Sequence, residues 1–326
     1  MPRSACPAYQ LPAAGVLTLF FLILPAAAGP PVAVYGIPSA PGVTGLPSGV
    51  THSAVWHIKA SPHFEIYHES SWSPAAIGLE LERMYSSMRL NLAMFAPWMV
   101  REKTKIYIYS GQKSYLAGEF DPPKWSKGLA FLSRKTVVVY DTGDMPQLKA
   151  VIAHELTHLY FESYFGEKLV YPPQWLNEGL AVFMEDNSYT GAGPWGRALP
   201  YLSKERLIGF DRFFTLKIEA LPSERQIGDW YLQSYGIVSY LYRPQQRLQF
   251  KNFCALLRNG GKVETSLWEV YRIKDTLEFE GKWLLWAGND TSKQNGGFYS
   301  LKPSASFNFK PAQFSSFEFV PFGTKK

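Results

Sequence analysis

Residues 154–158 read His-Glu-Leu-Thr-His. On an α-helix, residues four apart lie on adjacent turns of one face, so the imidazoles of His154 and His158 can reach the same ion. Zinc accepts imidazole nitrogen as a ligand, and Glu155 is positioned to take a proton from a water molecule held by the metal. The spacing therefore predicts a metal centre with hydrolytic chemistry. The alternative is two hydrogen-bonded core histidines, which is disfavoured because burying them beside an unpaired carboxylate is costly.

A third ligand is expected from the segment Trp-Leu-Asn-Glu-Gly-Leu-Ala at residues 175–181. A catalytic zinc usually has three protein ligands and one open position. Glu178 lies on the next predicted helix after His158 and can supply a carboxylate if the two helices pack together. The alternative for Glu178 is an ordinary acid on a helix surface. We predict one Zn²⁺ per chain, held by His154, His158 and Glu178.

Hydrophobic periodicity predicts the elements that position these residues. Residues 147–165 are apolar almost all round and predict a buried helix, and a Pro-Pro break separates them from a second helix at 174–185. Alternating or β-branched runs predict strands at 63–69, 104–110, 128–132 and 136–140. A further helix is expected to begin with Ser73 as its cap and Pro74 at its first position, with an apolar stripe from Ile77 to Leu92. More helices are expected over 229–261 and 264–287. The fold class is therefore α+β, with an N-terminal mixed sheet and a mainly helical C-terminal part.

Composition excludes some classes of protein. The chain has 326 residues, of which 46% are hydrophobic, so it can form a core and is not intrinsically disordered. Its formal net charge of +6 is mild, and Arg243, Arg247 and Lys251 are spaced as a solvated helix face. No nucleic-acid partner is expected. Cys254 lies in a run with helical apolar spacing and is expected to be a buried core residue.

Both ends of the chain differ from its middle. Residues 1–28 predict a signal peptide, because Arg3 precedes an apolar run that ends in three alanines. An uncleaved membrane anchor is the alternative, although prolines interrupt the run. We expect an exported protein, periplasmic or extracellular, with no stable membrane insertion after cleavage. Residues 29–53 form a Pro/Gly-rich leader, 54–287 the folded domain, and 288–326 a polar Gly/Phe-rich tail that is either an edge strand or disordered.

Together, HELTH, WLNEGLA and the Trp230–Tyr235 segment resemble the gluzincin metallopeptidases, in particular the secreted bacterial peptidase MA-like families, over about residues 55–287. The resemblance implies a thermolysin-like zincin core in which His154, His158 and Glu178 bind zinc and Glu155 is the general base. It also implies that Tyr231 donates a hydrogen bond to the tetrahedral intermediate, with Tyr235 as the second candidate. Residues 128–132 would be the sheet edge along which the substrate backbone binds.

The expected function is therefore a zinc-dependent peptidase acting on peptide or protein substrates. The G-x-M-E-N loop of the aminopeptidase branch does not occur upstream of His154, which favours an endopeptidase. Two alternatives remain open: a non-catalytic cell-envelope binding protein on a metallopeptidase scaffold, and a zinc hydrolase of a non-peptide amide or ester. Glu162 is a candidate for orienting a ligand. The remaining histidines are interpreted as structural: His52, His57, His63 and His68.

Overall fold

The computed structural model describes residues 55–70, 76–124 and 126–288, all of which belong to one compact unit, Ser48–Lys326. The predicted signal peptide and nearly all of the predicted leader and tail lie outside the described residues, as do Ser73 and Pro74. Among the described residues, no helix is both long and apolar enough to cross a membrane.

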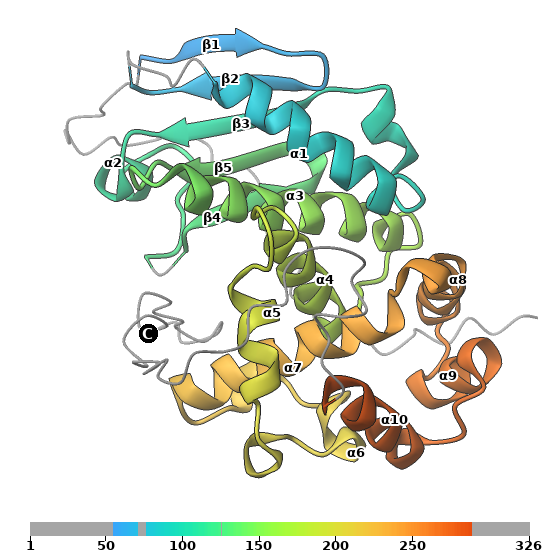
Figure 1. The fold of residues 1–326 in the computed structure, drawn as a ribbon. Coiled ribbons are helices and arrows are strands. Elements are labelled where there is room, and N and C mark those ends of the chain that lie inside the picture. Colours follow the sequence, from blue (N-terminus) through green and yellow to red (C-terminus); the bar gives the residue numbers. More distant parts are fainter. Residues whose placement is uncertain (1–54, 71–75, 125, 289–326) are drawn as a thin grey trace, which may run out of the picture. The chain divides into compact units, whose positions relative to one another are not determined.

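A five-stranded mixed sheet forms the N-terminal part, with strand order β1-β2-β3-β5-β4 (Figure 1). Strands β2, β3 and β5 are parallel, whereas β1 and β4 run antiparallel at the two edges. Four of these strands coincide with the predicted ones. The bounds are β1 His57–Ala60, β2 Phe64–His68, β3 Thr104–Tyr109, β4 Gly128–Phe131 and β5 Thr136–Tyr140. Every residue of the unpredicted β1 is exposed, so it carries no alternating apolar signal.

Two helices cover one face of this sheet, α1 (Ile77–Leu92) and α3 (Met145–Gly166) (Figure 1). Alternate residues of the central strands are fully buried on the covered face, including Phe64, Ile106 and Val137. Helix α3 has its N-cap at Asp144, whose side chain accepts a hydrogen bond from the backbone N–H of Gln147 at 3.4 Å. The helix that carries the histidines is thus anchored at its start and packed along the sheet.

The remainder of the described chain is helical, which confirms the α+β class. Helix α4 packs closely against both α3 and α7. The larger helices are α4 Gln174–Asp186, α7 Glu224–Leu241, α8 Arg247–Arg258, α9 Val263–Tyr271 and α10 Thr276–Gly288. Short α-helices are α2 Gln112–Leu116, α5 Pro194–Ala198 and α6 Phe210–Phe213, and 3-10 turns occupy Pro97–Val100, Leu132–Arg134, Leu199–Tyr201, Lys204–Arg206, Ile218–Ala220 and Pro244–Gln246. Cys254 is fully buried in α8, as predicted.

Candidate metal centre

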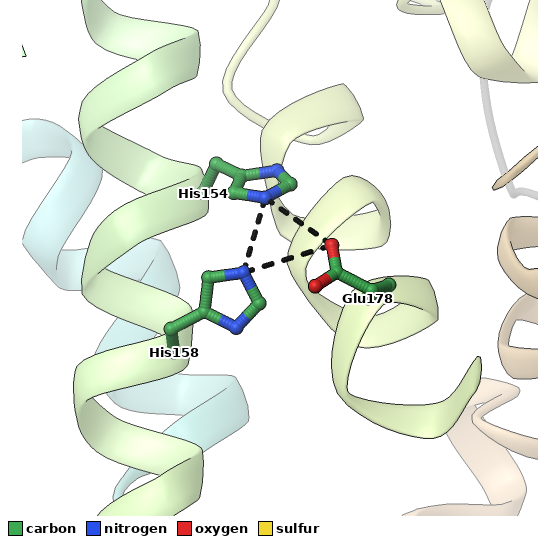
Figure 2. A group of neighbouring side chains, drawn as sticks. All are labelled: His154, His158 and Glu178. Atoms are coloured by element: carbon green, nitrogen blue, oxygen red, sulfur yellow. Dashed lines mark hydrogen bonds and ion pairs between the residues drawn. The ribbon is translucent and has the colours of Figure 1, made fainter. Parts of the chain in front are cut away.

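Three side chains from two helices converge between α3 and α4 (Figure 2). His154 and His158 lie on successive turns of α3, and their Nε2 atoms are 3.1 Å apart. From α4, the Oε2 atom of Glu178 lies 3.7 Å from Nε2 of His154 and 3.8 Å from Nε2 of His158. One ligand atom from each residue can be chosen so that all three lie within 4.8 Å of one another. These are the three residues predicted from the sequence as ligands.

The donor set and the local charge both fit a divalent cation. Oε2 of Glu185 lies 3.0 Å from Nδ1 of His154. Because a carboxylate only accepts hydrogen bonds, Nδ1 of His154 carries a proton. When the ring is in its neutral form, the Nε2 lone pair therefore faces the centre. Burial alone would lower the pKa of His154, but the hydrogen bond to Glu185 and nearby carboxylates, including Glu155 and Glu178, raise it to about 9. This excess of negative charge favours a bound cation, and two imidazoles with one carboxylate suit zinc.

Glu155 directly follows His154 on α3 and faces strand β4. A Cβ added at Gly128 would lie 2.7 Å from Cγ and 2.9 Å from Oε1 of Glu155. The β4 backbone therefore approaches this carboxylate more closely than any larger residue would allow. Burial raises the pKa of Glu155, while the charges of His154 and His158 oppose that shift. The structure thus places the predicted base against the edge strand, where its charge interacts with both histidines.

Tyr231 and Tyr235 of α7 were the two candidates for donating a hydrogen bond at this centre. The structure shows that their hydroxyl groups have different partners. The hydroxyl of Tyr231 is hydrogen-bonded to Glu178, and its pKa is raised well above the ordinary value by burial and by the charge of that carboxylate. By contrast, the hydroxyl of Tyr235 donates to Oδ2 of Asp186 at 3.0 Å. Tyr231 therefore belongs to the centre, whereas Tyr235 stabilises a neighbouring buried carboxylate.

Close packing of α4 on α7 brings Tyr231 to Glu178. A Cβ added at Gly179 would lie 2.7 Å from the backbone oxygen of Ser234 and 2.8 Å from a methyl carbon of Val238. Real Cβ atoms do not make contacts this short, so the glycine that follows Glu178 allows the two helices to approach. The glycine of the WLNEGLA segment therefore has a packing role that its sequence context did not reveal.

Replacing Gly179 with alanine is expected to lower the free energy of unfolding by about 1–3 kcal/mol, because the added methyl group overpacks the α4–α7 contact. Gly228→Ala in α7 is the matched control. Apart from its chain neighbours and the backbone of its own helix, no atom lies within 4 Å of a Cβ added at Gly228. That substitution should therefore stabilise the helix by about 0.5–1 kcal/mol. Denaturant unfolding of both variants measures the difference. Equal stabilisation by the two substitutions would contradict the packing role of Gly179.

Glu185 is a functional candidate that the sequence analysis missed. It lies about two helical turns beyond Glu178 on α4, so the two carboxylates share a face, and this spacing could have revealed it. Glu162, the candidate chosen from the sequence, approaches His158 only to 3.7 Å between Oε1 and Nδ1, which is too long for a hydrogen bond. Its Oε1 instead accepts a hydrogen bond from Nδ2 of Asn177 at 2.8 Å.

The other described histidines lie away from the centre. His57 is exposed on β1. Nδ1 of His63 lies 2.7 Å from Oε2 of Glu82, and Nδ1 of His68 lies 3.0 Å from the backbone oxygen of Ser70. His52 is outside the described residues. Within the described part of the chain, His154, His158 and Glu178 form the only cluster of three or more possible metal ligands.

Comparison with known proteins identified no similar protein or family. A scan against protein-family models and a search of curated proteins both found no match to this chain. A function is therefore inferred from the site itself. Its geometry provides two imidazole nitrogens and a carboxylate that could hold a metal ion, together with a second carboxylate and a phenol hydroxyl beside them. Such groups can support metal-assisted hydrolysis.

Proposed function

We propose that this protein is an exported zinc-dependent peptidase of the gluzincin type, with a thermolysin-like core and endopeptidase activity. The observation that carries the proposal is the convergence of His154, His158 and Glu178 within 4.8 Å, from two separate helices. The mixed sheet packed on α3 and its antiparallel edge strand β4 are consistent with such a core.

His154, His158 and Glu178 would hold the zinc ion. When bound, the ion supplies Lewis acidity that polarises a scissile carbonyl and activates water for attack. The carboxylate of Glu155 accepts a proton from the attacking water and later delivers one to the leaving amine nitrogen. The hydroxyl of Tyr231 keeps its proton, because its pKa is raised, and donates a hydrogen bond to the developing oxyanion.

Strand β4 would bind the substrate backbone. It lies at the sheet edge, and β5 is its one strand partner among the described residues. An extended peptide can pair with such an edge through backbone hydrogen bonds, which do not depend on sequence. Because Gly128 lies directly against Glu155, a peptide bound along β4 would pass beside the proposed base.

The proposal is tested by incubating the zinc-loaded protein with a peptide library, with the chelated protein as control. We expect internal cleavage of peptides that requires zinc. Zinc-dependent hydrolysis of amide or ester compounds without any peptide cleavage would replace the peptidase with a hydrolase of non-peptide substrates. A protein that binds zinc and hydrolyses neither class would be a binding protein on this scaffold.

Tyr231→Phe is expected to lower kcat by about 100-fold or more, because one oxyanion donor is lost while the ring remains. Zinc content should be unchanged, since Tyr231 is not a ligand. Tyr235→Phe is the matched control. It removes the hydrogen bond to Asp186 and should instead lower the free energy of unfolding by about 1–3 kcal/mol. Steady-state kinetics and denaturant unfolding distinguish the two tyrosines, and a larger kcat loss in Tyr235→Phe would reverse their roles.

A further inference from the structure

Two neighbouring carboxylates at the end of α4 are buried, Glu185 at 8% exposure and Asp186 at 6%. Asp186 binds the start of α5. Its Oδ1 accepts from the backbone N–H of Trp195 at 2.9 Å, and its Oδ2 accepts from the backbone N–H of Gly196 at 3.2 Å. A Cβ added at Gly193 would lie 2.1 Å from Oδ1. The backbone at Trp195 is therefore fixed against the end of the helix that carries Glu178.

Glu185 binds the side chain of the same tryptophan. The indole Nε1–H of Trp195 donates to Oε1 of Glu185 at 3.3 Å, while Oε2 of Glu185 bonds to Nδ1 of His154 at 3.0 Å. The two oxygens of one carboxylate thus connect Trp195 to a ligand histidine. Lys127 also faces Glu185: burial lowers the pKa of Lys127, and the charge of Glu185 opposes that shift.

We infer that Trp195 is a positioning residue of the metal centre. It holds Glu185 in the orientation that keeps the proton of His154 on Nδ1 and its Nε2 lone pair directed at the metal. The inference rests on the proposed zinc site. Partners of this kind determine the orientation of a ligand histidine, and their loss typically lowers metal affinity 10–100-fold. Trp195 is 4% exposed, so water does not readily replace its N–H at Oε1.

The test measures the zinc affinity of the full chain by competition with a chelator. Trp195→Phe removes the indole N–H but keeps an aromatic ring beside Tyr231, whose ring centroid lies 6.2 Å away. We expect this variant to bind zinc about 3- to 10-fold more weakly, and Glu185→Ala to bind it about 10- to 100-fold more weakly. In the Glu185→Ala background, Trp195→Phe should cause no further loss, because its partner is already absent.

Trp283→Phe is the matched control. Trp283 is 1% exposed, and its indole nitrogen is buried without a hydrogen-bond partner among the residues that the structure describes. We expect its zinc affinity to equal that of the wild type. Denaturant unfolding of each variant establishes that it is folded.

Two results would overturn the inference. One is an unchanged zinc affinity in folded Trp195→Phe. The other is an equal decrease in zinc affinity on Trp195→Phe whether residue 185 is Glu or Ala, which would mean that Trp195 acts through its packing and not through Glu185. Failure of the wild-type protein to bind zinc would instead reject the proposed function. If Trp195→Phe does not fold, Glu185→Gln replaces it. The amide has one acceptor oxygen for the two donors, Nε1–H of Trp195 and Nδ1–H of His154, so it cannot accept from both and zinc binding should weaken. Unchanged zinc affinity in folded Glu185→Gln would also overturn the inference.

Discussion

His158→Ala should reduce bound zinc from about one ion per chain to almost none and reduce hydrolysis to background. A catalytic zinc site has three protein ligands, and removing one leaves two donors on different helices, which is too few for stable binding. Nδ1 of His158 is buried without a hydrogen-bond partner among the described residues, so the ring is not required for a protein hydrogen bond at that atom. Metal analysis of protein purified without added zinc, together with peptide hydrolysis, measures both effects.

His57→Ala is the control for that substitution. His57 is exposed on β1, outside the centre, so the variant should keep its zinc and its activity. Wild-type zinc content and activity in His158→Ala would show that this histidine is not a ligand. Absence of zinc from the folded wild type, even after zinc is supplied, would favour the non-catalytic alternative.

Glu155→Gln should lower kcat by about 1000-fold or more while zinc remains bound. The amide has nearly the size of the carboxylate and fits against Gly128, but it cannot accept a proton from the attacking water. Zinc should be retained because Glu155 is outside the ligand set. Measurements of kcat, KM and zinc content on the same preparation separate loss of the base from loss of the metal.

Glu167→Gln provides the matched control, because Glu167 directly follows α3 and its side chain is 62% exposed in an ion pair with Arg258. We expect its kinetics to equal those of the wild type. Undiminished turnover by Glu155→Gln would reject the proposed mechanism even if the zinc site were established. The two variants His158→Ala and Glu155→Gln therefore test metal binding and proton transfer independently.

The sequence alone determined the elements that carry the chemistry. The relative placement of His154 and His158 follows from the helix repeat, which is a local property, and the apolar pattern of residues 147–165 predicted the buried helix that contains them. The strand at 63–69 was predicted for a similar reason, since alternating burial leaves a repeat of two in the sequence. The strands at 104–110 and 136–140 were predicted from their β-branched and aromatic residues. The α+β class followed from the order of these elements. Strand β1 was missed because none of its residues is buried.

Tertiary structure alone decided which partners reach the centre. Tyr231 and Tyr235 lie one turn apart on α7, so the sequence left both open. The close contact at Gly179 and the bond from Tyr235 to Asp186 fix that helix so that Tyr231 reaches Glu178. Glu185, rather than Glu162, lies within hydrogen-bond distance of a histidine of the candidate centre for the same reason. Such choices depend on the packing of helices far apart in sequence, which no local repeat records.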